Sequence, residues 1–379
     1  MKKLLVIAAL AALASPAFAS KARLNSLGNA EHLIDPQTTF NNPSHMLWMS
    51  DFVTFETGPT TPTYSAATPP SKSASSEGGF VRSAGDARYM AYLGRDSDLT
   101  GVARQSQGFL TQENPIDLMY AMKGTWNWGV GLSLSNSDKK STSQKQNAYG
   151  LRLGASNDLW EVYATIGLGS TATGSTGATN PGFITDTTAK YTGTTGFKVG
   201  AAYKVENLYS YLKYFQDGYK YESSAGAGLN AAVNGASTVV SQLDLGVVDH
   251  NKIDGGQWFY GVALQIYQNK MDGAANAAAN SKTDAQYLPF LLGLEYDAAT
   301  WATLRASVTQ NVLIGTTKTA GAAPSPADSV DTISNNTTVA GGLGLHLNKF
   351  VIDGSLAAST TGNANTANLL TNVALTYNF

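Results

Sequence analysis

Few residues of this chain could perform covalent or metal chemistry. Its 379 residues include four His and no Cys. A nucleophile and its base must lie within about 3 Å of each other, and zinc sites need closely spaced His or Cys ligands. His32, His45, His250 and His346 are far apart along the chain, and none falls in a predicted surface loop. We therefore expect no enzyme, no metal site and no cofactor.

Charged side chains are the other chemically active groups, and they are sparse. Only 14% of the residues are charged, with 25 Lys plus Arg against 27 Asp plus Glu. A nearly neutral chain lacks the basic field that nucleic acids require. Several charges instead alternate with large apolar residues, so they share the polar face of a strand. Opposed charges on such a face could orient water and select ions. The candidates for this channel lining are Arg88, Arg152, Lys198, Lys213, Asp244 and Arg305.

The elements that must position these residues have a period of two. Over residues 126–135 every even-numbered side chain is large and apolar, and every odd one is small or polar. The pattern recurs along the chain, with short links (206–207, 348–349) alternating with long ones (170–194, 217–237). This predicts an all-β fold, a transmembrane antiparallel β-barrel with short periplasmic turns and long surface loops.

Large aromatic residues give a second regularity, because they gather next to the short links. An interfacial girdle explains this placement, whereas a β-sandwich, the weaker alternative, would concentrate aromatics at mid-strand. The predicted girdle consists of Trp126, Trp160, Trp258, Trp301, Tyr203, Tyr296 and Phe350.

The last strand resembles that of Gram-negative outer-membrane barrels. Residues 371–379 alternate to the end, with Val373, Leu375, Tyr377 and Phe379 on one face. In those barrels a terminal aromatic residue is recognised by the barrel-assembly machinery. The resemblance implies that these four residues form the assembly signal.

The strand count follows from the alternation. Fourteen strands are clear from Ala87 onward, and residues 50–57 and 78–83 would bring the number to sixteen. We prefer sixteen, although an even number also allows fourteen. A barrel of this size leaves room for an aqueous channel. We expect it to span residues 49–379.

The N-terminus contains two further segments. Residues 1–19 form a signal peptide, with Lys2 and Lys3, an apolar run, and a small-x-small site ending at Ala19. The apolar run is too short for a membrane anchor, so the exported chain should begin at Ser20. Residues 20–48 do not alternate, and we expect a periplasmic plug or strap. Gly28-Asn29-Ala30 and the later Asn42-Pro43 resemble the N-terminal hatch of the long-chain fatty-acid transporter family, although Ser44 replaces the usual Ala.

The whole exported chain resembles outer-membrane porins, in the style of the major outer-membrane proteins of predatory deltaproteobacteria. This resemblance implies a water-filled channel for passive diffusion of small hydrophilic solutes and ions. The alternatives are a plugged barrel for hydrophobic compounds, similar to the fatty-acid transporters, and a structural or surface-recognition barrel. The implied location is a Gram-negative outer membrane, with lipids, lipopolysaccharide and the barrel-assembly machinery as partners and a homotrimer as a candidate assembly.

One departure from the trimeric general porins concerns their third surface loop, which folds into the lumen as an acidic wall. Here the third long link, residues 137–145, is short and basic. The preceding long link, residues 95–115 with Asp96, Asp98 and Glu113, is the candidate for such a constriction.

Overall fold

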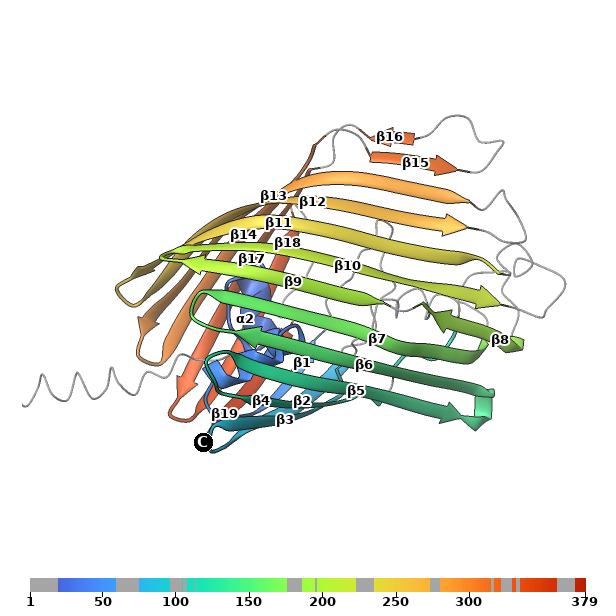
Figure 1. Ribbon diagram of the computed structural model, residues 1–379. Helices are drawn as coiled ribbons and strands as arrows, with labels where there is room; N and C mark the ends of the chain where they lie inside the picture. Colours follow the sequence, from blue (N-terminus) through green and yellow to red (C-terminus); the bar gives the residue numbers. More distant parts are fainter. Residues whose placement is uncertain are drawn as a thin grey trace, which may run out of the picture.

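The chain folds into a closed antiparallel β-barrel (Figure 1). The computed structural model describes residues 20–58, 75–95, 104, 108–112, 114–175, 186–194, 196–222, 235–272, 280–314, 317–321, 329–331, 335–359 and 372–379. Strand β1 pairs with β2 on one side and with β19 on the other, so the sheet closes on itself. Within these residues the wall consists of sixteen barrel-forming strands, here called staves, which confirms the preferred strand number.

The sixteen staves are consecutive along the chain and antiparallel to their neighbours. They are β1 (Phe52–Gly58), β2 (Ser75–Ala84), β3 (Ala87–Leu93), β4 (Ile116–Met122), β5 (Asn127–Lys139), β6 (Gln144–Ser156), β7 (Trp160–Ser175), β9 (Phe197–Val205), β10 (Leu208–Glu222), β11 (Ser237–Ile253), β12 (Gly256–Asp272), β13 (Ser281–Ala299), β14 (Ala302–Leu313), β17 (Asn335–Leu347), β18 (Phe350–Ser359) and β19 (Asn372–Asn378). Strand β8 (Asp186–Gly193) pairs with β7 and β10 beyond the end of β9, and β15 (Thr317–Gly321) and β16 (Ser329–Asp331) form a small hairpin beside β13.

The two faces of the wall are inverted relative to a soluble protein. In β4, Ile116 and Leu118 are 41% and 47% exposed, while Asp117 between them is fully buried. The same alternation places apolar side chains outside and charged ones inside in the other staves. A continuous exposed apolar surface marks contact with an apolar medium, and a barrel exposes no unpaired backbone groups to it. The wall is therefore built for a bilayer.

The staves differ in height, and this corrects the predicted link lengths. Strands β11 and β12 have 17 residues each, about 56 Å at the usual rise per residue, whereas a bilayer core needs only about 9–11 residues. The predicted loop at residues 137–145 is instead a continued hairpin, with β5 and β6 joined by η3 (Lys140–Thr142). The extended parts of β5 and β6 carry polar side chains on both faces, and this hides the alternation.

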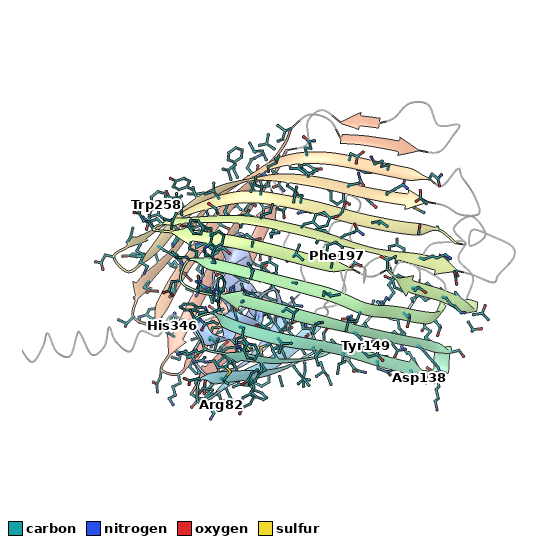
Figure 2. The ribbon with its side chains drawn as sticks, viewed as in Figure 1. Arg82, Asp138, Tyr149, Phe197, Trp258 and His346 are labelled. Atoms are coloured by element: carbon teal, nitrogen blue, oxygen red, sulfur yellow. The ribbon has the colours of Figure 1, made fainter. Side chains whose placement is uncertain are left out.

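The strand ends that flank the predicted short links lie at one end of the barrel, the turn end, and those that flank the predicted long links lie at the other, the loop end (Figure 1). Figure 2 shows Trp258 at the turn end and Asp138 at the loop end. The seven predicted girdle residues lie within or next to strand ends at the turn end, and all are between 36% and 59% exposed. Trp160 and Tyr203 pair across neighbouring strands, with ring centroids 4.5 Å apart.

Residues 20–48, here called the inner segment, lie inside the barrel. Figure 1 shows α2 (Lys21–Ser26) enclosed by the strands, nearer to the turn end. Two short 3-10 helices follow, η1 (Pro36–Phe40) and η2 (Pro43–Trp48). Each begins with Pro after an Asp or Asn cap: Asp35 accepts a hydrogen bond from the Gln37 amide at 3.0 Å, and Asn42 accepts one from the Ser44 amide at 3.1 Å. Such short helices are unstable alone, so the wall must hold them.

Candidate functional site

The inner segment touches every one of the sixteen staves among the described residues. The contacts run around the wall: Lys21 with Glu56 (β1) and Glu77 (β2), Thr39 with Met90 (β3), η2 with β4, Pro43 with Gly129 (β5), Ser44 with Ser156 (β6), His45 with Glu161 (β7), Asn41 with Lys198 (β9), Glu31 with Lys213 (β10), His32 with His250 (β11) and Phe259 (β12), Arg23 with Glu295 (β13), and α2 with β14, β17, β18 and β19. This ring of contacts is the candidate functional site.

A four-residue ion network joins α2 to β13, β14 and β18. Arg23 donates from Nε and Nη2 to the two Glu295 carboxylate oxygens, both at 2.8 Å. Arg305 donates from Nε to the same Glu295, at 2.8 Å, and pairs with Asp353. All but Glu295 are under a tenth exposed. A buried charge pair of this geometry is costly to break from one side, so the network fixes the start of the inner segment.

A second group of ionic contacts lies on β9 to β11, which β12 separates from the first group. Lys213 pairs with Glu31 of the inner segment and, at 3.1 Å, with Asp244 of β11. Lys198 donates to the Asn41 side chain at 3.0 Å. Arg23, Glu31 and Asn41 therefore give the segment polar anchors on β13, β10 and β9.

Two apolar clusters complete the set of wall contacts that holds the inner segment, here called its seat. One packs Phe40 and Met46 of the inner segment against Phe52, Met90 and Met119 of the wall, and the other packs Leu27 and Leu33 against Tyr209, Val248 and Phe259. At Gly28, where φ is +65°, an added Cβ would stand 2.6 Å from Leu291 Cδ1. Only glycine fits this left-handed backbone so close to the wall.

All six predicted lining residues face the interior, but the structure surrounds them with partners rather than with open water. Arg152 is paired with Asp117, and Arg305 with Glu295 and Asp353. Lys198, Lys213 and Asp244 meet the inner segment or each other, as described above. Arg88 lies near the turn end, 4.0 Å from Asp51. Sequence reasoning missed Arg23, Glu31, Gln37, Glu56 and Glu77, which carry no periodic signal or sit in the weakest strands.

The predicted acidic constriction, Asp96, Asp98 and Glu113, lies outside the described residues. The described parts of the same link turn inward. Arg95 stacks over Phe40 at 4.0 Å and donates to Gln37 of the inner segment at 3.3 Å. At the loop end, Phe109 is buried against Tyr191 and Tyr221 of β8 and β10, with centroids 6.0 and 5.4 Å away. The start of this link, at Arg95, therefore contacts the inner segment, and Phe109 contacts the wall at the loop end.

Three of the four histidines, His32, His45 and His250, form contacts between the inner segment and the wall, whereas His346 lies 2.9 Å from Thr303 within the wall. His32 stacks on His250 at 5.1 Å, and burial, together with the charge on His250, lowers the pKa of His32 to about 3. His45 Nδ1 lies 2.8 Å from Thr38 Oγ1, and its Nε2 lies 3.4 Å from Glu161. The Thr38 hydroxyl donates to the Asp35 carbonyl at 2.8 Å, so it caps η1 and is not directed at a reaction partner. Among the described residues no group of three His, Asp or Glu side chains could hold a metal ion.

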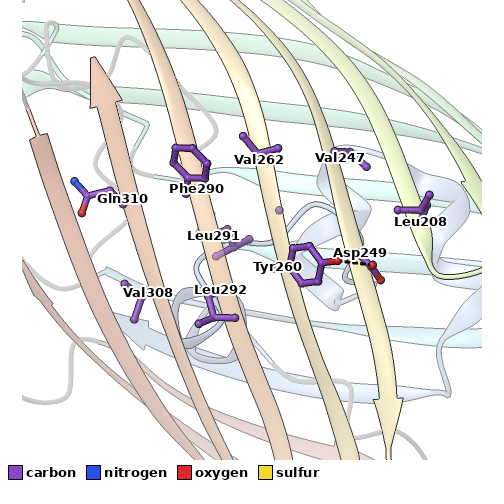
Figure 3. A pocket seen from close by; sticks show the side chains of 11 residues that line it. Leu208, Val247, Asp249, Tyr260, Val262, Phe290, Leu291, Leu292, Val308 and Gln310 are labelled. Atoms are coloured by element: carbon purple, nitrogen blue, oxygen red, sulfur yellow. Dashed lines mark hydrogen bonds between the residues drawn. The ribbon is translucent and has the colours of Figure 1, made fainter. Parts of the chain in front are cut away.

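A shallow apolar hollow of about 490 Å³ lies on the outer face of β10 to β14 (Figure 3). Its sides are Leu208, Val262, Phe290 and Val308, and the Tyr260 hydroxyl donates to Asp249 there at 2.8 Å. It faces away from the lumen and does not belong to the ring of contacts. No helix in the described part of the chain has both the length and the apolar character needed to cross a membrane.

No protein-family model and no curated protein matches this chain. Among solved structures the barrel is similar to a porin refined at 1.8 Å resolution (12% identity, TM-score 0.39, covering 87% of this chain and 99% of that chain). It is also similar to a FadL homologue of Pseudomonas aeruginosa (12%, 0.44, 95% and 98%) and to the trimer form of OmpT, an outer membrane protein of Vibrio cholerae (10%, 0.37, 87% and 98%). Likeness at this level concerns the arrangement of strands and carries nothing about function. The described residues themselves form a closed antiparallel β-barrel of sixteen strands, as the sequence predicts.

Proposed function

We propose that this protein is an outer-membrane channel for small hydrophilic solutes and ions, gated by its inner segment. In this proposal charged and hydroxyl side chains line the path of solutes through the barrel, and apolar side chains face the lipid. Water-filled barrels require this distribution. Sequence patterns favoured an open diffusion pore. Residues 20–48 make a plugged form of the same channel the better supported one.

The observation that carries the proposal is the ring of contacts around all sixteen staves. A segment that merely crossed below the mouth would touch a few neighbouring strands. Polar anchors such as Arg23, Glu31 and Asn41 can exchange their partners for water, whereas each barrel strand is hydrogen-bonded to both of its neighbours. The inner segment can therefore leave its place without breaking the barrel.

The remaining expectations belong to this proposal. Residues 1–19 act as the signal peptide, and the turn end faces the periplasm of a Gram-negative cell. The aromatic girdle contacts the lipid interface, with lipopolysaccharide around the loop end. Val373, Leu375, Tyr377 and Phe379 direct insertion by the barrel-assembly machinery. The protein acts without catalysis or a cofactor, either as a single barrel or as a homotrimer.

Planar-bilayer recording tests the gate. The protein purified from membranes should conduct in brief openings separated by long closures, and a chain lacking residues 20–48 should stay open. The matched control is the full chain with Lys282→Met, a half-exposed residue at the loop end that pairs with Asp284. Steady conductance that the deletion leaves unchanged would contradict the gate, and silence of both chains would contradict the channel.

A hydrophobic cargo is the second candidate, and a local feature of the wall favours it. The ladder between β12 and β13 skips the pairs Ala263 with Pro289 and Leu264 with Leu288, because proline has no N–H to donate. The gap adjoins the outer hollow and Leu291, which packs against the inner segment. A disulfide between Leu264→Cys and Leu288→Cys should then block uptake of a fatty acid while leaving ion conductance intact. Equal uptake in the oxidised and reduced proteins would exclude this route.

A further inference from the structure

Two buried carboxylates at the start of the inner segment lack a balancing charge. Glu56 of β1 and Glu77 of β2 stand directly opposite each other in the ladder and are 4% and 5% exposed. Like charges at opposite positions of neighbouring strands repel each other, and burial removes the water that would stabilise them. When both are ionised, the two carboxylates therefore need a positive charge nearby.

The described neighbours supply hydrogen bonds and one cation. Gln37 Nε2 donates to Glu56 and Glu77 at 3.0 and 3.1 Å, and the Tyr92 hydroxyl donates to Glu77 at 3.0 Å. These amide and hydroxyl groups are neutral. Among the described residues, the ion pairs to the two carboxylates come from Lys21 alone, through its ammonium group on Glu77. One negative charge remains, on the side of Glu56.

The backbone at the expected cleavage site lies beside that charge. The Lys21 amide donates to Glu56 Oε2 at 2.9 Å. Ser20, the preceding residue, is fully buried in extended conformation, and its hydroxyl has no hydrogen-bond partner in the described part of the chain. The Ser20 nitrogen is one residue along the backbone from the amide that donates to Glu56, and one residue spans at most about 3.6 Å. While Ala19 is attached, that nitrogen is a neutral amide.

We propose that removal of residues 1–19 creates the missing cation: the α-ammonium group of Ser20 pairs with Glu56 and locks the inner segment in the barrel. One water molecule hydrolyses the Ala19–Ser20 bond, leaving a carboxylate on Ala19 and an amine on Ser20 that takes up a proton. α-Amino groups titrate near pH 7.7–8.0, and a neighbouring carboxylate favours the charged form. The inference rests on the export and gating proposed above. It makes signal-peptide cleavage the step that completes the seat of the plug.

Moving the amine by one residue tests the pairing. A Gly inserted between Ala19 and Ser20 leaves the cleavage sequence intact but displaces the new amine by up to about 3.6 Å. The matched control, Ser20→Ala, keeps the amine in place and removes only the hydroxyl. The insertion should raise the open fraction of single channels on the order of tenfold, since it separates a buried charge pair, and the control should not. Equal open fractions in the two variants would overturn the proposal.

A second measurement does not depend on conductance. Mass spectrometry of the purified protein should find a free amine on Ser20, and a chain that begins elsewhere would overturn the inference. Treatment of the folded protein with an acetylating ester at pH 7 should modify the exposed Lys145 and spare Ser20. The double variant Glu56→Gln, Glu77→Gln should make Ser20 reactive. If Ser20 of the unaltered folded protein reacts as fast as Lys145, the amine is not buried and the proposal fails. If no variant conducts, the gate fails, and this labelling still decides the pairing.

Discussion

Arg23 offers the sharpest test of the inner segment as a gate. Its guanidinium makes two charge-assisted hydrogen bonds to Glu295 at 2.8 Å and a third to the Ile34 carbonyl at 3.2 Å. Arg23→Met keeps the apolar stem of the side chain and removes all three. The expected result is a large shift toward the open channel, because the two bonds to Glu295 join the inner segment to the wall and exist only while the segment is seated.

The magnitude follows from what Glu295 retains. Removing one partner of a buried ion pair costs about 3–5 kcal/mol when the other is left alone. Here Glu295 keeps Arg305 at 2.8 Å and Gln257 at 2.9 Å, so the loss should be nearer to about 1.5–3 kcal/mol, the range for hydrogen bonds to charged groups. That free energy changes the open-to-closed ratio by about 10- to 150-fold.

Single-channel recording of Arg23→Met, Glu295→Gln and the double variant measures this ratio as a double-mutant cycle. The two single changes should be less than additive, because each removes the same pair. Lys282→Met controls for loss of a cation far from the inner segment. An Arg23→Met channel that folds, inserts and opens as rarely as the control would refute the gating role of this network.

Three further outcomes are expected. The pKa of His32 lies at about 3 in the seated segment, below its ordinary 6.5, so the inner segment is held less tightly as pH falls below 6.5. The open fraction should therefore rise by up to about tenfold per pH unit between pH 6.5 and 4.5. A flat pH response, equal to that of His32→Phe, would contradict this. Gly28→Ala should lower the thermal stability by about 1–3 kcal/mol, more than Gly85→Ala, because both have φ near +60° but only Gly28 faces a wall atom within 4 Å; equal losses would argue against tight seating. Phe379→Ala should reduce the amount of protein in outer membranes while sparing the stability of the folded barrel, since Phe379 is 54% exposed, and Phe350→Ala, also exposed, should not; equal membrane levels would remove Phe379 from the assembly signal.

The wall was predictable from the sequence because its two environments differ so strongly. When one side of the wall is lipid, Leu118 must face outward and the neighbouring Asp117 inward. The alternation with period two therefore marks each barrel strand and predicts the number of strands. Above the membrane that contrast disappears. Residues 137–139 and 144–145 extend the hairpin of β5 and β6 with polar side chains on both faces, and alternation therefore ended before the strands did.

The seat of the inner segment was largely beyond sequence reasoning. Placing Arg152, Arg305 and Asp353 inside requires only the alternation, whereas pairing Arg305 with both Asp353 and Glu295 requires the register of three strands. Arg23 and Glu31 lie in a segment without periodicity, and nothing local to them indicates a partner hundreds of residues away. The expectation of a plug or a strap came from a resemblance, and the contacts of Arg23 and His32 favour the plug.

The ring of contacts also constrains the order in which the molecule can be made. The inner segment is synthesised before any stave, yet its seat includes both β1 and β19, which meet only when the sheet closes. Contacts between residues so distant in sequence form late, after the cost of closing the intervening chain has been met. The first part of the exported chain to be translated is thus the last to reach its final position. The inner segment can make its full set of contacts only after the barrel around it has closed.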